Sequence, residues 1–102
     1  MTKSELITLL ATKQPHLLPK DIDLAVNNII DTMIATLVNG NRIEVRGFGA
    51  FSTVDRKACL GRNPKTGDAV SLPKRRSIHF KAGLDMREKV DASRLVFPKI
   101  KD

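Results

Sequence analysis

The segment between residues 61 and 68 constrains the fold of this chain more than any other. Its sequence is Gly-Arg-Asn-Pro-Lys-Thr-Gly-Asp, with Pro64 near the centre and Gly61 and Gly67 close to either end. Proline fixes φ and has no N–H group, so Pro64 interrupts any regular hydrogen-bonded ladder. The two glycines can adopt positive φ at little cost. This pattern predicts a polar turn that joins two strands.

The charges around this turn suggest a function. Arg62 and Lys65 lie on either side of Pro64, so positive charge surrounds a small apolar ring. An apolar side chain pushed into a base step, with cations on the flanking phosphates, is one way in which proteins bend a duplex. We therefore interpret the segment as the tip of a β-arm that enters a DNA groove. The alternative is a basic surface hairpin without a partner, because glycine, asparagine and proline form turns in many settings.

Alternating residues on both sides of the turn predict an antiparallel sheet. In residues 42–46, apolar side chains alternate with charged ones, which gives a strand with one apolar face. We predict a second strand at residues 50–58, a returning limb at residues 69–72 and a third sheet segment at residues 78–81. The result is a three-stranded antiparallel sheet that extends into an arm over about residues 56–76.

Two local features interrupt these strands. Residues 47–49 are Gly-Phe-Gly, which predicts a tight turn with Phe48 directed into the core. Pro73 marks an irregularity in the returning limb, because proline cannot donate to a ladder. The phenylalanines expected in the core are Phe48, Phe51 and Phe80.

Two helices precede the sheet. Thr2 and Glu5 match a capping box at the start of the first helix, which should end near Gln14 because a proline follows. Pro19 suits the first turn of the second helix. Apolar residues recur with a 3.6-residue period over residues 22–38, which predicts about five helical turns.

The apolar stripe of the second helix is broad for a chain of this size. A small body that also carries an extended arm buries a poor core by itself. The stripe therefore predicts an intertwined dimer, in which two chains share one core and present their arms as a pair.

The end of the chain is predicted to be a short helix and a tail. Gly83 precedes the helix, which covers about residues 84–90. We expect residues 1–91 to form one domain of the α+β class and residues 92–102 to form a basic, flexible tail in which Phe97 can pack locally.

The charge of the chain is uneven. Residues 1–55 carry a net charge of −1, whereas residues 56–102 carry +8. A polyanion is the natural partner of such a basic half. A membrane surface would also attract it, but no basic amphipathic helix stands out, so we expect no membrane binding.

Several other classes of protein are disfavoured. No signal peptide and no run long enough to span a membrane is recognised, which predicts a cytoplasmic protein. The single cysteine, Cys59, cannot form an internal disulfide. His16 and His79 have no partner at a recognised motif spacing, and phosphate-binding, metal-ligand and nucleophile motifs are absent. We therefore predict no enzymatic activity, no catalytic residue, no metal and no cofactor.

Three motifs resemble a known family. They are Ile-Glu-Val-Arg-Gly-Phe-Gly-Ala-Phe at residues 43–51, Gly-Arg-Asn-Pro-Lys-Thr-Gly at residues 61–67 and Phe-Lys-Ala-Gly at residues 80–83. Together they resemble the bacterial HU and integration host factor (IHF) proteins over about residues 1–91. The predicted order of helices and strands is also that of the family. The opening residues, 1–7, and the pair Glu44 and Arg46 resemble most the β subunits of IHF.

The resemblance implies a mechanism and a partner. It implies a heterodimer with an IHF α-type subunit, in which two arms enter the minor groove and Pro64 intercalates between base pairs. Arg62 and Asn63 match family positions beside the intercalating residue. Arg46 matches a position whose side chain reaches the minor groove, with Glu44 orienting it.

The candidate DNA contacts extend from the arm to the body. They are Glu44, Arg46, Arg56, Arg62, Asn63, Pro64, Lys65, Lys74, Arg75, Arg76, Lys81 and Arg87. The chain departs from the family pattern at Ala82, where many relatives have proline, at Leu60 beside the tip, and in a longer tail from Ala92.

The resemblance implies an architectural, nucleoid-associated protein that serves site-specific recombination, transcriptional and translational control and nucleoid organisation. Two alternatives remain open. One is an HU-like homodimer that compacts DNA without sequence preference. The other is a basic module that binds RNA or an acidic protein and does not bend DNA. The sequence does not identify the target site.

Overall fold

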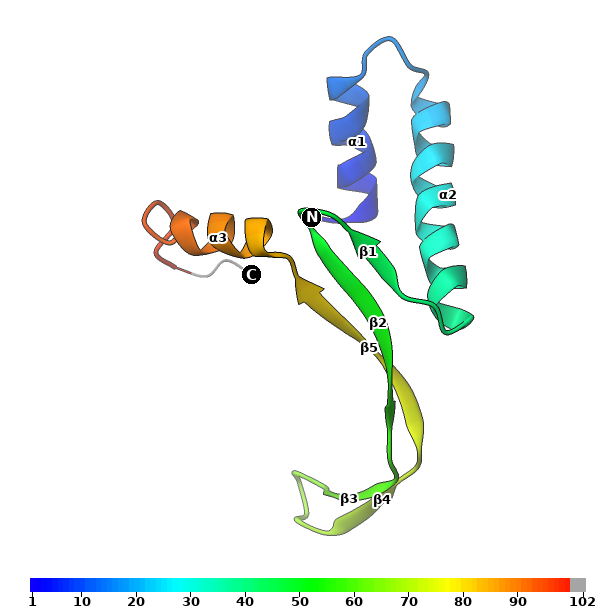
Figure 1. The fold of residues 1–102 in the computed structure, drawn as a ribbon, viewed down its shortest axis with the longest axis vertical. Helices are drawn as coiled ribbons and strands as arrows, with labels where there is room; N and C mark the ends of the chain where they lie inside the picture. Colours follow the sequence, from blue (N-terminus) through cyan, green and yellow to red (C-terminus); the bar gives the residue numbers. More distant parts are fainter. Residues whose placement is uncertain (100–102) are drawn as a thin grey trace.

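A computed structural model describes residues 1–99 of the 102-residue chain. The elements in this part, in chain order, are α1 Lys3–Lys13, α2 Pro19–Val38, β1 Ile43–Val45, β2 Gly49–Arg56, β3 Cys59–Arg62, β4 Ala69–Leu72, β5 Arg75–Ala82 and α3 Leu84–Ser93. The predicted α+β class is confirmed. The last three residues of the expected tail lie outside the described residues. Figure 1 shows the helical hairpin at one end of the molecule and the arm at the other.

Local signals set the ends of the two long helices. Thr2 Oγ1 accepts a hydrogen bond from the Glu5 N–H at 3.2 Å, which satisfies a free donor of the first turn of α1. The helix ends before Gln14, as predicted. Pro19 occupies the first turn of α2, where its missing N–H costs nothing. The predicted starts of both helices are confirmed.

The body sheet has the order β1-β2-β5, with β2 in the centre, and all pairs are antiparallel. Successive side chains of a strand point to opposite faces, so the register assigns each residue to one of two faces. The inner face carries Ile43, Phe51, Thr53, Asp55, Arg76, Ile78 and Phe80. The outer face carries Glu44, Ala50, Ser52, Val54, Arg56, Arg75, Ser77, His79 and Lys81. Helix α2 lies on the inner side, where its residues Ile34, Leu37 and Val38 line a hollow of about 270 Å³ together with Thr53 and Ile78.

Three phenylalanine rings form an aromatic cluster near α3. Phe51 and Phe80 lie opposite each other with ring centroids 4.6 Å apart, and Phe48 lies 5.3 Å from Phe80. A Cβ at Gly49 would lie 2.5 Å from the Lys81 carbonyl oxygen, so only glycine fits beside this cluster. The prediction that all three rings are core residues is wrong for the single chain, in which Phe51 and Phe80 are half-buried and Phe48 is 45% exposed.

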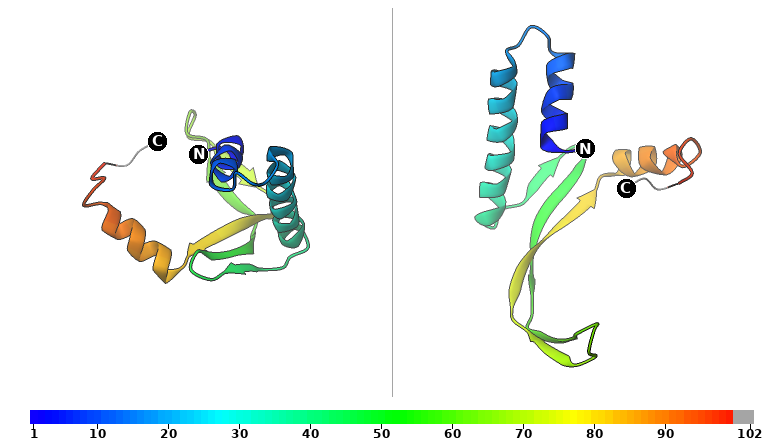
Figure 2. Two further views of the ribbon diagram at one scale, coloured as in Figure 1. Left: turned by 90° about the horizontal axis from the view of Figure 1, so that it is seen from above. Right: turned by 180° about the vertical axis from the view of Figure 1, so that it is seen from behind.

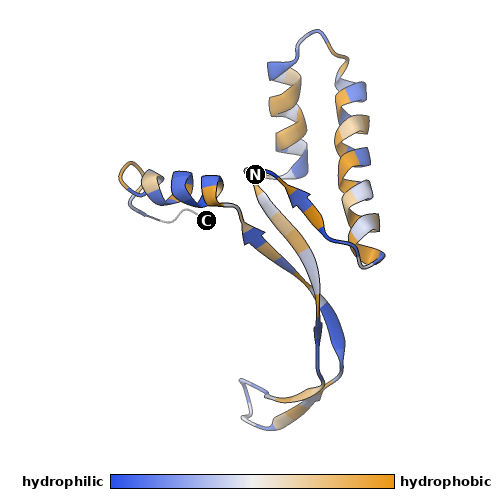
Figure 3. Ribbon diagram, in the orientation of Figure 1, coloured by the Kyte–Doolittle hydropathy of each residue, from blue (hydrophilic) through white to orange (hydrophobic). Residues whose placement is uncertain are grey.

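The single chain buries few side chains. Among residues 1–99, only Ile22 and Val26 count as buried hydrophobic residues. Ile29, Ile34 and Val38 of α2 are all more than half exposed. Figure 3 shows hydrophobic residues along both α1 and α2. The broad apolar stripe of α2 is therefore largely exposed in the single chain.

The arm consists of two ladder segments with a break between them. β2 and β5 pair as far as Arg56 and Arg75, residues 57–58 and 73–74 lie outside the strands, and β3 and β4 then pair toward the tip. The prediction of one continuous second strand is therefore wrong. The irregularity at Pro73 is confirmed, because a residue without an N–H cannot continue the ladder.

This break does not shift the register of the arm. Arg56 opposes Arg75, and three residues further along each limb Cys59 opposes Leu72. The alternation of side chains between the two faces is therefore preserved through the break. Figure 2 shows the ribbon curving where the two segments meet.

Helix α3 is longer than predicted. It runs to Ser93 rather than ending near Val90, and a turn follows it. The Phe97 N–H donates to the Ser93 carbonyl oxygen at 2.8 Å, so the first residues of the expected tail continue from the helix.

Candidate nucleic-acid interface

The arm tip is a turn closed by its own backbone. The Asn63 N–H donates to the Asp68 carbonyl at 2.8 Å, and the Gly67 N–H donates to the Asn63 carbonyl at 2.7 Å. Asn63 Oδ1 also accepts from the Lys65 N–H at 2.9 Å, as asparagine does in turns. Gly67 has φ of 74°, which favours glycine. The turn therefore holds Pro64 at its apex, where the ring is exposed.

Gly61 and Arg62 precede the apex and contribute to this geometry in different ways. Arg62 Nη1 donates to the Gly67 carbonyl at 3.2 Å, and the remaining guanidinium N–H groups stay available. Gly61 does not use its conformational freedom. It lies in β3, and a Cβ there would be 3.0 Å from a methyl group of Leu72, so its small size makes room for that side chain.

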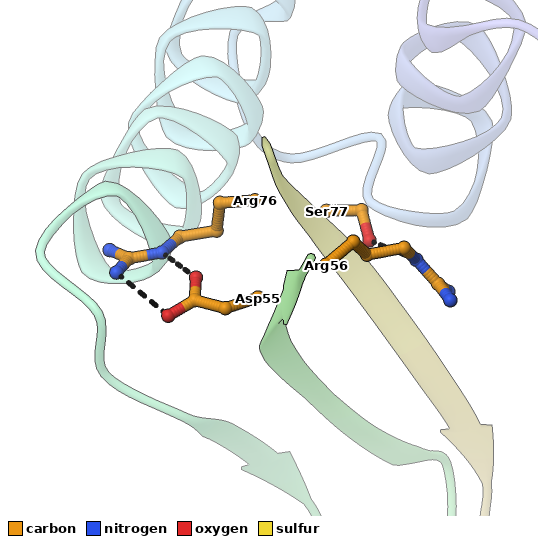
Figure 4. Close-up of polar contacts among 4 residues, drawn as sticks. All are labelled: Asp55, Arg56, Arg76 and Ser77. Atoms are coloured by element: carbon orange, nitrogen blue, oxygen red, sulfur yellow. Dashed lines mark hydrogen bonds and ion pairs between the residues drawn. The ribbon is translucent and has the colours of Figure 1, made fainter. Parts of the chain in front are cut away.

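The outer face of the arm base carries two arginines in direct opposition. Arg56 and Arg75 are register partners, and like charges directly opposite each other are unfavourable. Arg56 Nε donates to Ser77 Oγ at 3.1 Å, which adds no negative charge (Figure 4). Among residues 1–99, neither arginine has a carboxylate partner. A bound anion would relieve the repulsion.

The inner face of the arm base is different. Arg76 Nε and Nη2 donate to the two carboxylate oxygens of Asp55 at 2.7 and 3.4 Å (Figure 4). The hydrogen bond and the charge of Arg76 lower the pKa of Asp55 and, reciprocally, raise the pKa of Arg76. The cluster expected at residues 74–76 is therefore divided. Lys74 lies in the break, Arg75 is on the outer face and Arg76 is neutralised on the inner face.

A groove on the body brings together residues from separate elements. Its volume is about 640 Å³, and its charged lining residues are Arg42, Glu44, Arg46, Lys81 and Arg87. Four of these are predicted site residues, contributed by β1, the following turn, β5 and α3. Arg42 is missing from the prediction, although the spacing of Arg42, Glu44 and Arg46 at every second residue could have indicated it. The arm tip, beyond β3 and β4, lies away from β1 and α3, which contribute residues to this groove (Figure 1).

The groove contains more positive than negative charge. No hydrogen bond or ion pair joins Glu44 to Arg46 within residues 1–99, so the structure does not form the expected orienting contact. On α3, Lys89 pairs with Asp85 at 3.4 Å, whereas the neighbouring Arg87 has no carboxylate partner in the same part of the chain. Arg87 therefore adds an uncompensated charge to the groove.

Comparison with known proteins identifies the family. The model of the family described as "Bacterial DNA-binding protein" matches residues 1–91. This chain belongs to that family, which includes the HU and IHF proteins. It is therefore an architectural DNA-binding protein.

Two curated relatives of this family member carry the name integration host factor subunit beta. The protein from Halorhodospira halophila is 55% identical over 94 residues, which cover 92% of each chain. The protein from Marinobacter nauticus is 56% identical over 93 residues, which cover 91% of this chain and 95% of the relative.

Solved structures of HU proteins share the fold. The Anabaena HU–DNA cocrystal structure has a TM-score of 0.77 and 36% identity, and it covers 88% of this chain and 97% of the HU chain. HU from Thermotoga maritima has a TM-score of 0.58 and 27% identity, over 88% and 98% of the two chains.

Residues 1–99 contain neither a helix that could span a membrane nor a cluster of metal-binding side chains. No helix there has the length and apolar character needed to span a bilayer. No group of three or more His, Cys, Asp or Glu side chains there could hold a metal ion. Cys59 is a free, exposed thiol on β3.

Proposed function

We propose that this chain bends duplex DNA as one subunit of a heterodimer with an IHF α-type subunit. The names of its curated relatives as beta subunits support a second, different subunit. In this proposal both arms enter the minor groove, and Pro64 intercalates between base pairs. The observation that carries it is the exposed Pro64 ring at the apex of the arm tip.

The hydrogen bonding of the tip supports intercalation. The N–H groups of Asn63, Lys65 and Gly67 are already bonded within the turn, so the apex can leave water without losing those bonds. The Pro64 ring is apolar and needs no hydrogen bond inside the base stack. Unstacking one step costs about a few kcal/mol, which contacts to the wrapped duplex offset.

The body and arm base would hold the bent duplex. Arg46 reaches the minor groove, and Arg87 and Lys81 contact phosphates from the body groove. Arg56 and Arg75 meet the backbone at the arm base, since no carboxylate neutralises them. Arg76 binds with the N–H groups that Asp55 leaves free. The full proposed set is Glu44, Arg46, Arg56, Arg62, Asn63, Pro64, Lys65, Lys74, Arg75, Arg76, Lys81 and Arg87.

The test is a bending measurement on a duplex with fluorophores at its two ends. We expect Pro64→Ala to reduce the bend while leaving the secondary structure of the dimer unchanged. Pro98→Ala makes the same chemical change outside the arm and serves as the control. A wild-type bend angle in the Pro64→Ala protein contradicts intercalation at this residue.

The same measurement separates the alternatives. Bending only with an α-type partner, and only on certain sequences, supports the heterodimer. Bending of any duplex by this chain alone indicates an HU-like homodimer, a second candidate that the similarity to the HU–DNA cocrystal structure favours. RNA or acidic-protein binding without bending rejects both.

The proposal also assigns a role to each part of the chain. Residues 1–91 are the DNA-bending domain with its arm at residues 56–76, and residues 92–102 are a basic tail. The protein acts on cytoplasmic, nucleoid DNA in recombination and gene control.

A further inference from the structure

The outer face of the β2–β5 ladder carries a histidine that the proposed DNA contacts do not include. Along β5, the outward-facing residues are Lys81, His79, Ser77 and Arg75. Neighbours in this row are two residues apart, which places them about 7 Å from each other along the strand. His79 therefore lies in one row with two cations that we assign to DNA.

The surroundings of His79 leave its imidazole accessible. Its register partner on β2 is Ser52, and Ala50 precedes Ser52 on the same face. These short side chains form a shallow surface beside the ring, and His79 is exposed. Helix α2 lies on the opposite side of the sheet, where it lines a hollow together with Ile78. A duplex that reaches Lys81 and Arg75 can therefore also reach His79.

The charges that face His79 are mostly positive. Lys81 and Arg87 lie beyond one end of its row, and Arg56 and Arg75 lie toward the other. Glu44 is the one carboxylate among the outward-facing residues of the sheet, and it opposes Ala50 rather than His79.

No carboxylate of residues 1–99 therefore neutralises this site. Asp85 of α3 lies near Gly47 and is paired with Lys89. No hydrogen bond or ion pair to His79 occurs within residues 1–99. A protonated imidazole here has no counterion in that part of the chain, and a polyanion laid along the face would supply one.

We propose that His79 is a further DNA-contacting residue and that its protonation tightens DNA binding. This inference rests on the proposed function. A neutral imidazole offers one N–H donor, whereas an imidazolium offers two and carries a charge. Histidine changes its charge between about pH 5 and 8. Because the bound duplex favours the charged form, binding takes up a proton, and affinity falls as the pH rises.

The experiment measures duplex affinity of the full-length dimer at pH 5.5 and pH 8.0, over a range of salt concentrations. The wild type should bind about two- to five-fold more tightly at pH 5.5, the size expected for an exposed charge pair. The slope of log affinity against log salt should steepen by about 0.9 at pH 5.5, because one more phosphate contact forms.

Two variants and one spectroscopic measurement complete the test. His79→Gln should lose the pH dependence of affinity and of the salt slope, and His16→Gln, which changes the other histidine, should keep both. In the wild type, the imidazole NMR signals of His79 should titrate at higher pH with DNA than without it. An unchanged pH profile in His79→Gln, or an unmoved titration, overturns the inference. Failure to bind or bend a duplex at either pH rejects the proposed function, and pH-independent binding rejects only the role of His79.

Discussion

The helical hairpin and the arm are both incomplete in the single chain, but in different ways. Helix α2 leaves apolar side chains exposed, among them Ile34 at 55% and Val38 at 73%. The arm base leaves positive charge uncompensated, because Arg56 and Arg75 oppose each other without a carboxylate partner in residues 1–99. Exposed apolar side chains are stabilised by burial against other apolar side chains, whereas uncompensated positive charge is stabilised by a bound anion.

This difference indicates that the two regions require different partners. The residues up to 55 carry a net charge of −1 and the rest carry +8, so the division is already present in the composition. Assembly through α2 should respond weakly to salt, because apolar burial is not screened. Binding through the arm should respond strongly.

The largest expected difference between the two regions is in their response to salt. If six to ten phosphates are contacted, raising salt from about 50 to about 200 mM should weaken DNA binding by about 10³- to 10⁵-fold. The dimer itself should persist over the same range. Affinity by fluorescence titration and mass by sedimentation check both parts, and a dimer that dissociates along with the DNA would remove the distinction.

A charge on the uncovered face of α2 should disrupt assembly. Ile29 of α2 is 60% exposed in the single chain, so Ile29→Asp would place a carboxylate on the apolar face that we expect a second chain to cover. We expect a loss of about 3–5 kcal/mol, the cost of an uncompensated buried charge. Concentration-dependent thermal unfolding measures it. Asn28→Asp, on an exposed position of the same helix, is the control and should change stability little.

Within the arm, Arg75 and Arg76 lie on opposite faces of the β2–β5 ladder, so their substitution compares the two faces directly. Arg75→Gln should reduce DNA affinity about tenfold and lower the salt slope by about one, because a phosphate contact is lost. Arg76→Gln should reduce affinity less, since Asp55 already pairs with Arg76. Equal losses in the two variants would show that the face of the ladder does not matter.

The smallest expected effect concerns acid stability. Arg76 lowers the pKa of Asp55 below its usual 3.8, so the ion pair stabilises the fold above that value and loses this contribution as the pH falls through the lowered pKa. Both side chains are exposed, so the change is small. As the pH is lowered from 5 to 2, the melting temperature should fall slightly less steeply for Asp55→Asn than for the wild type. Parallel curves for the two proteins would assign no role to the pair.

Local signals made parts of this fold predictable from sequence. The cap at Thr2 and the proline at position 19 each act within one turn of helix, so the helix starts required no knowledge of the rest of the chain. The same holds for the turn around Pro64. The family resemblance added the order of the strands.

Features that depend on register or on a second chain were not predictable in the same way. Asp55 and Arg76 are 21 residues apart, and only their opposition in the ladder makes them partners. Pro73 indicates a break in one limb, but nothing in residues 57–58 indicates it in the other. The 45% exposure of Phe48 in the single chain was not indicated by its place between two glycines.

The unshifted register across the arm break limits how such arms can change in length. Removing one residue from each limb would keep the ladder paired but would turn every side chain of the tip to the opposite face. Removing two from each limb would restore the orientation and shorten the arm. Functional arms should therefore differ in length by multiples of four residues. Measuring DNA bending by the two deletion variants would test this expectation.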